Sequence, residues 1–277
     1  MSSKQILVPL VTPLTPEGNV CADSVGRLMQ FLHPHVDGFV PCLTSGEGWE
    51  LSQTQWRDML RYCFGNANGK TVIAGIEKPT TGEVITYAES AAELGVNAIM
   101  ITAPFKKNLN QHQLFDHFVD VHNNTGLDIY IYYESVLCGS QLELERLIRL
   151  CHLPRVVGIK ESTGTSDIVR HLQTIQECNV RLYHGWEDKL LQYESDGCIV
   201  SYSNLDPELC SAVINGRDLM DNQRLIKNCQ EQGLFLPDWY RAVKKALRAR
   251  GTIQCDLTVN DSIKRLQDDN AQATIPA

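Results

Sequence analysis

A single lysine follows an apolar run in the segment Arg155-Val-Val-Gly-Ile-Lys-Glu-Ser162. Read as a strand, this run places Val156, Gly158 and Lys160 on one face, because successive strand side chains point to opposite sides. Desolvation of an inward lysine disfavours the ammonium and lowers its pKa from about 10.4 towards roughly 7–8. The neutral amine is then a nucleophile for a carbonyl carbon and forms a Schiff base. The alternative is a lysine that reaches solvent past the end of the strand.

Hydroxyl and acidic residues cluster in the segment Thr44-Ser45-Gly46-Glu47, where a predicted strand gives way to a helix. Backbone N–H groups at such a junction bind carboxylates, and Glu47 would then cap or brace the loop. The alternative is an ordinary turn that caps the N-terminus of the helix.

Three tyrosines lie in another strand-like run, Asp128–Tyr133. The alternation of a strand places Tyr130 and Tyr132 on one side and Tyr133 on the other. A tyrosine near the end of an inward strand face suits proton transfer to and from an imine. Aromatic residues are also ordinary strand formers, so a purely structural role is the alternative.

Short β-like runs alternate with amphipathic helical patterns along the chain, and this alternation predicts an α/β fold. Eight repeats point to a (β/α)8 TIM barrel with additional C-terminal helices. We expect one domain over residues 1–277, with the barrel in residues 1–215 and a C-terminal helical extension and tail in residues 216–277. A doubly wound sheet is the competing architecture. However, no glycine-rich fingerprint follows the first strand, where Pro9-Leu-Val-Thr-Pro13 stands.

The elements are predicted from these patterns with the following bounds. The strands are Gln5–Leu10, Asp37–Cys42, Thr71–Ile76, Asn97–Thr102, Asp128–Tyr133, Arg155–Lys160, Arg181–Gly185 and Cys198–Tyr202. The barrel helices are Asp23–Leu32, Ser52–Phe64, Gly82–Leu94, Gln111–Asn123, Leu142–Cys151 and Ser166–Glu177. Ser52 and Thr81 are predicted helix caps. Two further helices are expected at Leu219–Gln232 and Trp239–Arg250, and the polar tail from Asp256 shows little strand or core signal.

Catalytic groups of such a barrel gather at the C-terminal ends of its strands. The predicted strand ends carry an amine, phenols, hydroxyls and acidic groups, which suit proton transfer around a carbonyl bound covalently to Lys160. These ends are Thr12-Pro13, Leu43–Glu47, Thr102–Pro104, Tyr132–Glu134, Lys160–Ser162 and His184–Asp188.

Composition excludes several other classes of protein. A net charge of -8 over 277 residues, without a dense Lys/Arg stripe, argues against nucleic acid as a partner. No stretch approaches about 18 apolar residues, and the N-terminus predicts no signal peptide, so no membrane is expected. The ten cysteines are scattered without a C-x-x-C pair, which favours reduced thiols and a cytoplasmic location. A spacing of five residues separates His112, His117 and His122, which places their side chains on different faces of a helix. No metal site is therefore expected.

Taken together, these motifs resemble the dihydrodipicolinate synthase/N-acetylneuraminate lyase family of class I, Schiff-base-forming pyruvate aldolases. The resemblance is carried by Lys160 in Val-Gly-Ile-Lys-Glu-Ser, by Thr44-Ser-Gly-Glu47 and by Tyr132. It extends over most of the chain, through Val11-Thr-Pro13, Ala91-Ala-Glu-Leu-Gly95 with Asn97-Ala98, and Gly197 through Asn204.

The resemblance implies a role for each matched residue. Lys160 would form the imine, Tyr132 would shuttle protons, and Thr44 would link Tyr132 to the relay. The backbone amides of Thr44 and Ser45 would hold the pyruvate carboxylate. Gly185 and Ile199 match positions that line the family's pocket. It also implies a homotetramer, often a dimer of dimers, with no cofactor or metal beyond the covalent imine to Lys160.

Departures from the family pattern argue against ordinary lysine biosynthesis. The usual Tyr-Asn-x-Pro run reads Tyr132-Tyr-Glu-Ser135, and Leu137 stands where synthases carry an arginine for the second substrate's carboxylate. The Pro-Tyr-Tyr segment, whose tyrosine enters a neighbouring subunit's site, reads Pro104-Phe-Lys-Lys107. The phenolic relay therefore lacks its third member unless another group substitutes, and whether Lys106 or Lys107 does so stays open.

We therefore expect a class I lyase or aldolase that joins or cleaves pyruvate, or a related 2-keto acid, and an aldehyde. Glu134 and the Glu187-Asp188 pair would bind hydroxyls or an amine on that aldehyde, although Glu134 also fits a solvated loop. The alternatives are 4-hydroxy-tetrahydrodipicolinate synthase proper, a 2-keto-3-deoxy sugar acid dehydratase, and a non-catalytic binding protein. The sequence leaves the aldehyde, the stereochemistry and the direction open.

Overall fold

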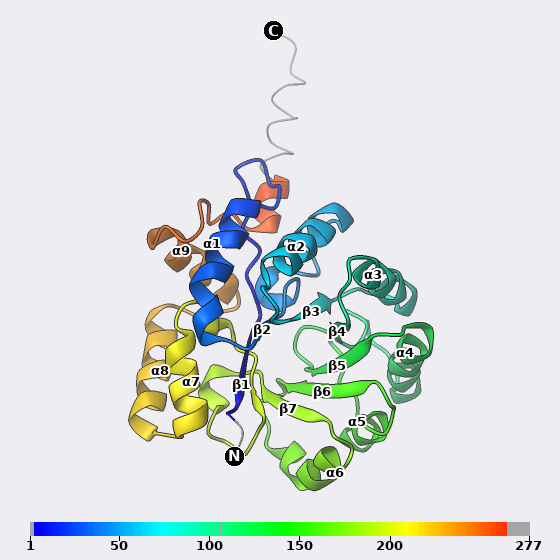
Figure 1. Cartoon of the computed structure of the whole chain (residues 1–277). Coiled ribbons are helices and arrows are strands. Elements are labelled where there is room, and N and C mark those ends of the chain that lie inside the picture. The colour runs from blue at the N-terminus through cyan, green and yellow to red at the C-terminus, as the bar shows by residue number, and fades with distance from the viewer. Residues whose placement is uncertain (1–2, 106, 265–277) are drawn as a thin grey trace, which may run out of the picture.

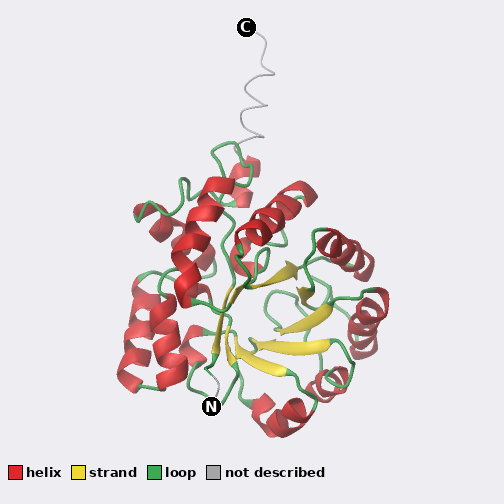
Figure 2. Ribbon diagram, viewed as in Figure 1, coloured by secondary structure: helices red, strands yellow, loops and turns green. Residues whose placement is uncertain are grey.

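Eight parallel strands form a closed barrel in the computed structural model, which describes residues 3–105 and 107–264. Each strand pairs with its neighbours in the sequence, and β8 closes on β1. The helices surround the strands (Figures 1 and 2), which confirms the predicted (β/α)8 architecture. The strands are β1 (Gln5–Val8), β2 (Gly38–Phe39), β3 (Thr71–Ile76), β4 (Ala98–Ile101), β5 (Asp128–Tyr133), β6 (Val156–Glu161), β7 (Arg181–His184) and β8 (Gly197–Cys198).

The helices α1 to α9 follow the predicted order, with one addition after β8. They are α1 (Ala22–Leu32), α2 (Gln53–Asn66), α3 (Thr81–Glu93), α4 (Gln111–Asn124), α5 (Leu144–Leu150), α6 (Leu172–Glu177), α7 (Pro207–Gly216), α8 (Leu219–Glu231) and α9 (Trp239–Ala249). The addition, α7, lacked a prediction of its own. Within the described ranges, no helix is long and apolar enough to cross a membrane.

Several predicted boundaries are wrong because loops take over at the strand ends. The predicted strand Cys198–Tyr202 stops at Cys198, and Ser201–Asn204 forms the 3-10 helix η5. The connection from β7 to β8 contains only the short 3-10 helix η4 (Glu187–Lys189), so the seventh repeat lacks an α-helix. The cap prediction holds at Ser52, which accepts a hydrogen bond from the Gln55 amide.

The cap predicted at Thr81 is wrong. Thr80 caps α3, because its side chain accepts a hydrogen bond from the Glu83 amide. Thr81 is the first helical residue, and its hydroxyl lies 2.9 Å from Nδ1 of His117 on α4. Two adjacent threonines at one helix start leave the sequence pattern ambiguous by one position.

The barrel interior is filled by one face of each strand. Tyr130 and Tyr132 belong to the interior cluster, whereas Tyr133 packs outward, as the alternation predicts. The expected placement of Val156 beside Lys160 is wrong. The β5–β6 register shifts between Ile129 and Tyr130, so Val156 joins the outer core while Lys160 stays inside.

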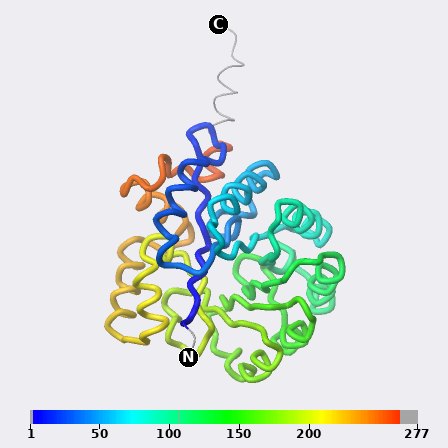
Figure 3. The backbone as a smooth tube through the Cα atoms, in the orientation of Figure 1, coloured from blue at the N-terminus to red at the C-terminus, as the bar shows by residue number. Residues whose placement is uncertain are grey.

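The C-terminal part packs closely on the barrel. Helices α7 and α8 lie side by side, and the described part of the chain ends close to α1 (Figure 3). The expected lack of core signal after Asp256 is wrong, since Thr258, Val259 and Ser262 are buried. The division at residue 215 stays a prediction, and Lys106 and residues 265–277 lie outside the described residues.

Candidate active site

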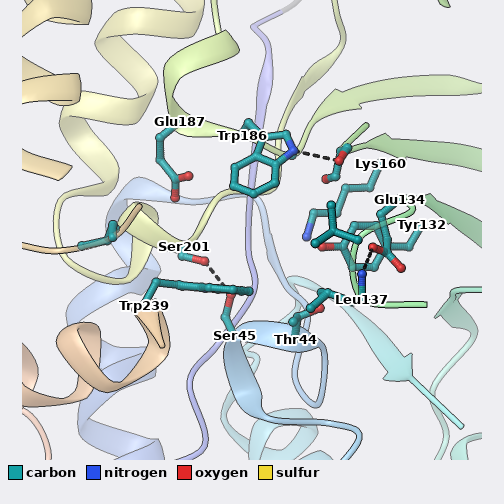
Figure 4. A pocket seen from close by; sticks show the side chains of 14 residues that line it. Thr44, Ser45, Tyr132, Glu134, Leu137, Lys160, Trp186, Glu187, Ser201 and Trp239 are labelled. Atoms are coloured by element: carbon teal, nitrogen blue, oxygen red, sulfur yellow. Dashed lines mark hydrogen bonds between the residues drawn. The ribbon is translucent and has the colours of Figure 1, made fainter. Parts of the chain in front are cut away.

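A cavity opens at the C-terminal ends of the strands, where a barrel of this type carries its chemistry. Lys160, Tyr132, Glu134 and Leu137 lie on one side of it (Figure 4), and Glu187 and Trp239 lie on the other. Its walls come from loops after five strands and from the C-terminal segment. The lining residues are Thr44, Ser45, Tyr132, Glu134, Val136, Leu137, Lys160, Ser162, Gly185, Trp186, Glu187, Ser201, Leu234 and Trp239.

Lys160 is the buried amine of this cavity. Its side chain is 4% exposed, and its Nζ lies 3.8 Å from the ring centroid of Tyr132. Burial lowers the pKa of Lys160 to about 8, and the carboxyl groups of Glu77, Glu187 and Glu134 limit that fall. A substantial fraction of this amine is therefore neutral near pH 8, which is the state a nucleophile requires.

Tyr132 is a phenol that keeps its proton at neutral pH. Burial raises its pKa well above the ordinary value, and the negative charges of Glu134 and Glu77 act in the same direction. Hydrogen bonding to Thr44 and Ser162 opposes this effect. The neutral phenol beside the Lys160 amine is placed to donate a proton and to take it back.

Thr44 and Ser45 are the first two residues of the 3-10 helix η2 (Thr44–Gly46). Their amides begin the helix, so no carbonyl of a preceding helical turn is available to them. The hydroxyls of Ser45 and Ser201 lie 2.6 Å apart (Figure 4). The hydroxyl of Thr44 shares a hydrogen bond of 2.5 Å with Oε1 of Glu77, a residue that the sequence analysis did not consider.

Glu47 follows η2 in the left-handed backbone conformation, with φ 59°. Its buried carboxylate forms an ion pair with the buried Lys244 of α9 and accepts a 2.6 Å hydrogen bond from the Val259 amide. Glu47 thus braces the C-terminal segment against the loop that carries Thr44 and Ser45.

Gly185 has no side chain, and this leaves room for Lys160 and Ser162. A Cβ at this position would lie 1.8 Å from the Ser162 hydroxyl and 3.1 Å from Cε of Lys160. We expect Gly185→Ala to displace both groups and to destabilise the fold by about 1–3 kcal/mol, as overpacking does. Thermal unfolding and trapping of a Lys160 adduct measure the two effects. Wild-type stability together with wild-type trapping would show that this close packing is unimportant.

The remaining predicted residues take different positions. Glu134 lines the cavity but is buried, and the solvated-loop interpretation is wrong. Its two oxygens accept hydrogen bonds from the amides of Leu137 (2.8 Å) and Cys138 (2.9 Å), which fixes the loop after β5. Ile199 packs in the interior cluster and is absent from the cavity wall.

On the wall opposite Lys160, Glu187 was predicted from the sequence, whereas Leu234 and Trp239 were not. Glu187 is buried, and burial raises its pKa while its Oε1 accepts a 3.0 Å hydrogen bond from the Tyr202 amide. Trp186 donates from Nε1 to the Ser162 carbonyl oxygen at 2.8 Å. Asp188, predicted as the partner of Glu187, instead pairs with Lys189 outside the cavity.

Sequence comparison places these features in one family. The model of the Dihydrodipicolinate synthetase family matches residues 2–262. The chain belongs to this family. The resemblance inferred from Lys160, Tyr132 and Thr44-Ser-Gly-Glu47 is thereby confirmed.

Individual members of the dihydrodipicolinate synthetase family match at modest identity. The 4-hydroxy-tetrahydrodipicolinate synthase of Synechococcus sp. (strain JA-2-3B'a(2-13)) is 30% identical over 67% of this chain and 61% of that protein, less than two thirds of its length. The Pelagibacter ubique (strain HTCC1062) protein of the same name is 26% identical over 94% of this chain and 92% of its own. The crystal structure of chloride-inhibited dihydrodipicolinate synthase from Acinetobacter baumannii, complexed with pyruvate, has a TM-score of 0.82 at 25% identity and covers 99% of this chain and 100% of that chain.

Two departures from the dihydrodipicolinate synthetase family pattern have clear positions in the structure. Leu137 lines the cavity, so an apolar side chain forms part of its wall. Phe105 is buried and stacks on Trp49 of its own chain, with ring centroids 5.7 Å apart. Across the described ranges, no group of three or more His, Cys, Asp or Glu side chains is arranged to hold a metal ion.

Proposed function

We propose that this chain is a class I, Schiff-base-forming lyase that makes or breaks a carbon–carbon bond between pyruvate, or a related 2-keto acid, and an aldehyde. The observation that carries the proposal is the buried Lys160 amine, 3.8 Å from the Tyr132 ring in the barrel mouth and with a pKa of about 8. An amine with this pKa and a neighbouring phenol are the two groups that imine formation requires.

The proposed reaction begins when Nζ of Lys160 attacks the ketone carbon. Loss of water gives an iminium, and loss of a proton or cleavage of a carbon–carbon bond gives the enamine. Tyr132 and Thr44 move the protons, while the amides of Thr44 and Ser45 hold the substrate carboxylate. The iminium serves as the electron sink, so the reaction uses no separate cofactor or metal.

The walls around Lys160 favour an aldehyde without a carboxylate. Leu137 and Val136 are apolar, and Glu134 and Glu187 are acidic. Among the described residues of the cavity wall, Lys160 is the one cationic side chain. A hydroxylated or amine-bearing aldehyde fits these walls better than an anionic one, which disfavours the lysine-biosynthetic synthase. A 2-keto-3-deoxy sugar acid dehydratase would use the same imine but release no pyruvate.

The state of the protein in the cell is also part of the proposal. All ten cysteines are free thiols, which supports a reducing, cytoplasmic location. Membership of the family supports a homotetramer built as a dimer of dimers. The exposed apolar side chains of Leu219, Met220 and Leu236 in the C-terminal part support contact with another subunit.

Borohydride reduction in the presence of pyruvate tests the proposal. The expected result is a pyruvate-derived adduct on the peptide that contains Lys160, identified by mass spectrometry. Lys78 provides an internal control, because it is also buried but its Nζ lies 3.3 Å from the carbonyl oxygens of Gly48 and Leu51. No adduct on Lys160 with pyruvate or with longer 2-keto acids would instead support a non-catalytic binding protein.

A further inference from the structure

Glu77 directly follows β3, on the inward side of the barrel. Ile73 belongs to the interior cluster, and the alternation of the strand carries the same orientation through Gly75 to Glu77. The Glu77 side chain is 1% exposed. Its Oε1 shares the 2.5 Å hydrogen bond with the Thr44 hydroxyl, which in turn interacts with Tyr132.

The carboxyl group of Glu77 is bonded differently from other buried carboxyl groups of the chain. Both oxygens of Glu134 and Glu161 accept hydrogen bonds, as expected for a carboxylate with a structural role. Oε2 of Glu77 is buried and has no hydrogen-bond partner within residues 3–105 and 107–264. An ionised carboxylate with an unpaired buried oxygen is more costly than a neutral carboxylic acid in the same place, because burial penalises a charge more than an unpaired neutral group.

The surroundings of Glu77 agree with a neutral acid. Burial raises the pKa of Glu77 to about 8, the Thr44 hydrogen bond lowers it, and nearby charges contribute smaller effects. Most Glu77 side chains are therefore protonated at pH 7. The titratable groups that face it are Lys160, Glu134, Lys78, Tyr132, Cys42 and Cys138.

We infer that Glu77 is the third member of the proton relay, placed by the chain itself where the family draws a tyrosine from a neighbouring subunit. The inference rests on the proposed Schiff-base function. The order of groups is Glu77, Thr44, Tyr132 and then the substrate on Lys160. Phe105, which belongs to the segment where the family carries its tyrosine, stacks on Trp49 of its own chain.

Iminium formation consumes one proton, and one carboxyl group can supply one proton. A neutral amine and a ketone consume one proton when they form an iminium and release water. Glu77 supplies that proton through Thr44 and Tyr132 and becomes a carboxylate. When the iminium loses a proton from the carbon next to it, the enamine forms and the proton returns to Glu77. The relay is then restored without any other acid.

Glu77→Gln tests the inference because it keeps the size and the acceptor oxygen but removes the acid proton. Solvent deuterium incorporation into the methyl group of pyruvate, followed by proton NMR in D₂O, reports enamine formation without the unknown aldehyde. We expect the exchange rate to fall about 10²-fold, the usual scale of general acid–base catalysis. Borohydride is expected still to trap the adduct on Lys160 at long incubation.

The pH dependence separates proton transfer from a structural effect. The wild-type exchange rate should rise as Lys160 loses its proton and fall above about pH 8 as Glu77 loses its own. Glu77→Gln should lose the falling limb.

Two further variants keep the result interpretable. Thr44→Val leaves Glu77 in place and breaks the relay, so it should also lose the falling limb even if Glu77→Gln does not fold. Glu161→Gln removes another buried carboxyl group, one that faces Thr163 and Tyr193, and should keep the wild-type exchange rate and pH profile. If wild type shows neither adduct nor exchange, the proposed function fails. If wild type shows both and Glu77→Gln matches its rate and pH profile, only the inference about Glu77 is overturned.

Discussion

Replacing Lys160 with methionine is expected to abolish imine chemistry while making the protein more stable. Without the amine no Schiff base forms, so pyruvate deuterium exchange should fall roughly 10⁴-fold or more, the scale seen when an enzyme loses its nucleophile. Methionine fills most of the lysine's volume and carries no charge into the barrel. The chemistry and the stability should therefore change in opposite directions.

The stability gain follows from the lowered pKa of Lys160. A pKa lowered from 10.5 to about 8 corresponds to about 3 kcal/mol of disfavoured charge at neutral pH. Between these two pKa values the unfolded chain binds one more proton than the folded protein, so wild-type stability rises with pH. The advantage of Lys160→Met in urea unfolding should therefore be full below about pH 8 and shrink towards pH 10.5.

Lys78→Met is the matched control for Lys160→Met. Lys78 is also buried, but its Nζ interacts with two backbone carbonyl oxygens and lies 4.7 Å from the Tyr87 ring centroid. Its loss leaves those carbonyls unpaired, so this variant should be less stable than wild type and still form the Lys160 adduct. A Lys160→Met protein that still exchanges pyruvate protons would refute the proposed role of Lys160.

The fold and the reacting amine were predictable because both rest on regular patterns. The alternation of strands and helices predicts the barrel. The alternation of side chains between the two faces of β6 predicts that Lys160 points into it. The same reasoning fails for Val156, since the register shift in the β5–β6 ladder reverses its side. A one-residue shift in strand register cannot be seen in the sequence here, because Val156, Val157 and Ile159 are all apolar.

Glu77 was missed although a signal for it was present. It directly follows β3, which was predicted with the observed bounds, and the rule that strand ends carry catalytic groups applies to it. The end of this strand was nevertheless left out of the predicted set of strand ends that carry chemistry. The burial of Glu187 and Thr258 was harder to foresee, because it depends on how the loops after β7 and α9 fold over the barrel mouth.

Lys244→Met is expected to destabilise the fold strongly from a position outside the cavity. Lys244 and Glu47 form an ion pair in which both side chains are 0% exposed. Removing only the lysine leaves a buried carboxylate without its counter-charge, which costs about 3–5 kcal/mol. The loss should appear as a lower free energy of unfolding in urea. Because α9 packs on η2, the same change should also loosen the part of the cavity wall that Trp239 and Ser45 form.

The double variant Glu47→Gln/Lys244→Met distinguishes an unpaired charge from lost packing. Removing both charges should recover part of the stability that Lys244→Met loses, because no buried ion remains uncompensated. Arg241→Gln is the control on the same helix. Arg241 pairs with Asp261, but its side chain is 35% exposed, so its loss should cost about 1 kcal/mol or less. If the double variant were as unstable as Lys244→Met, the pair would stabilise α9 through packing, and the left-handed Glu47 would serve only to turn the chain after η2.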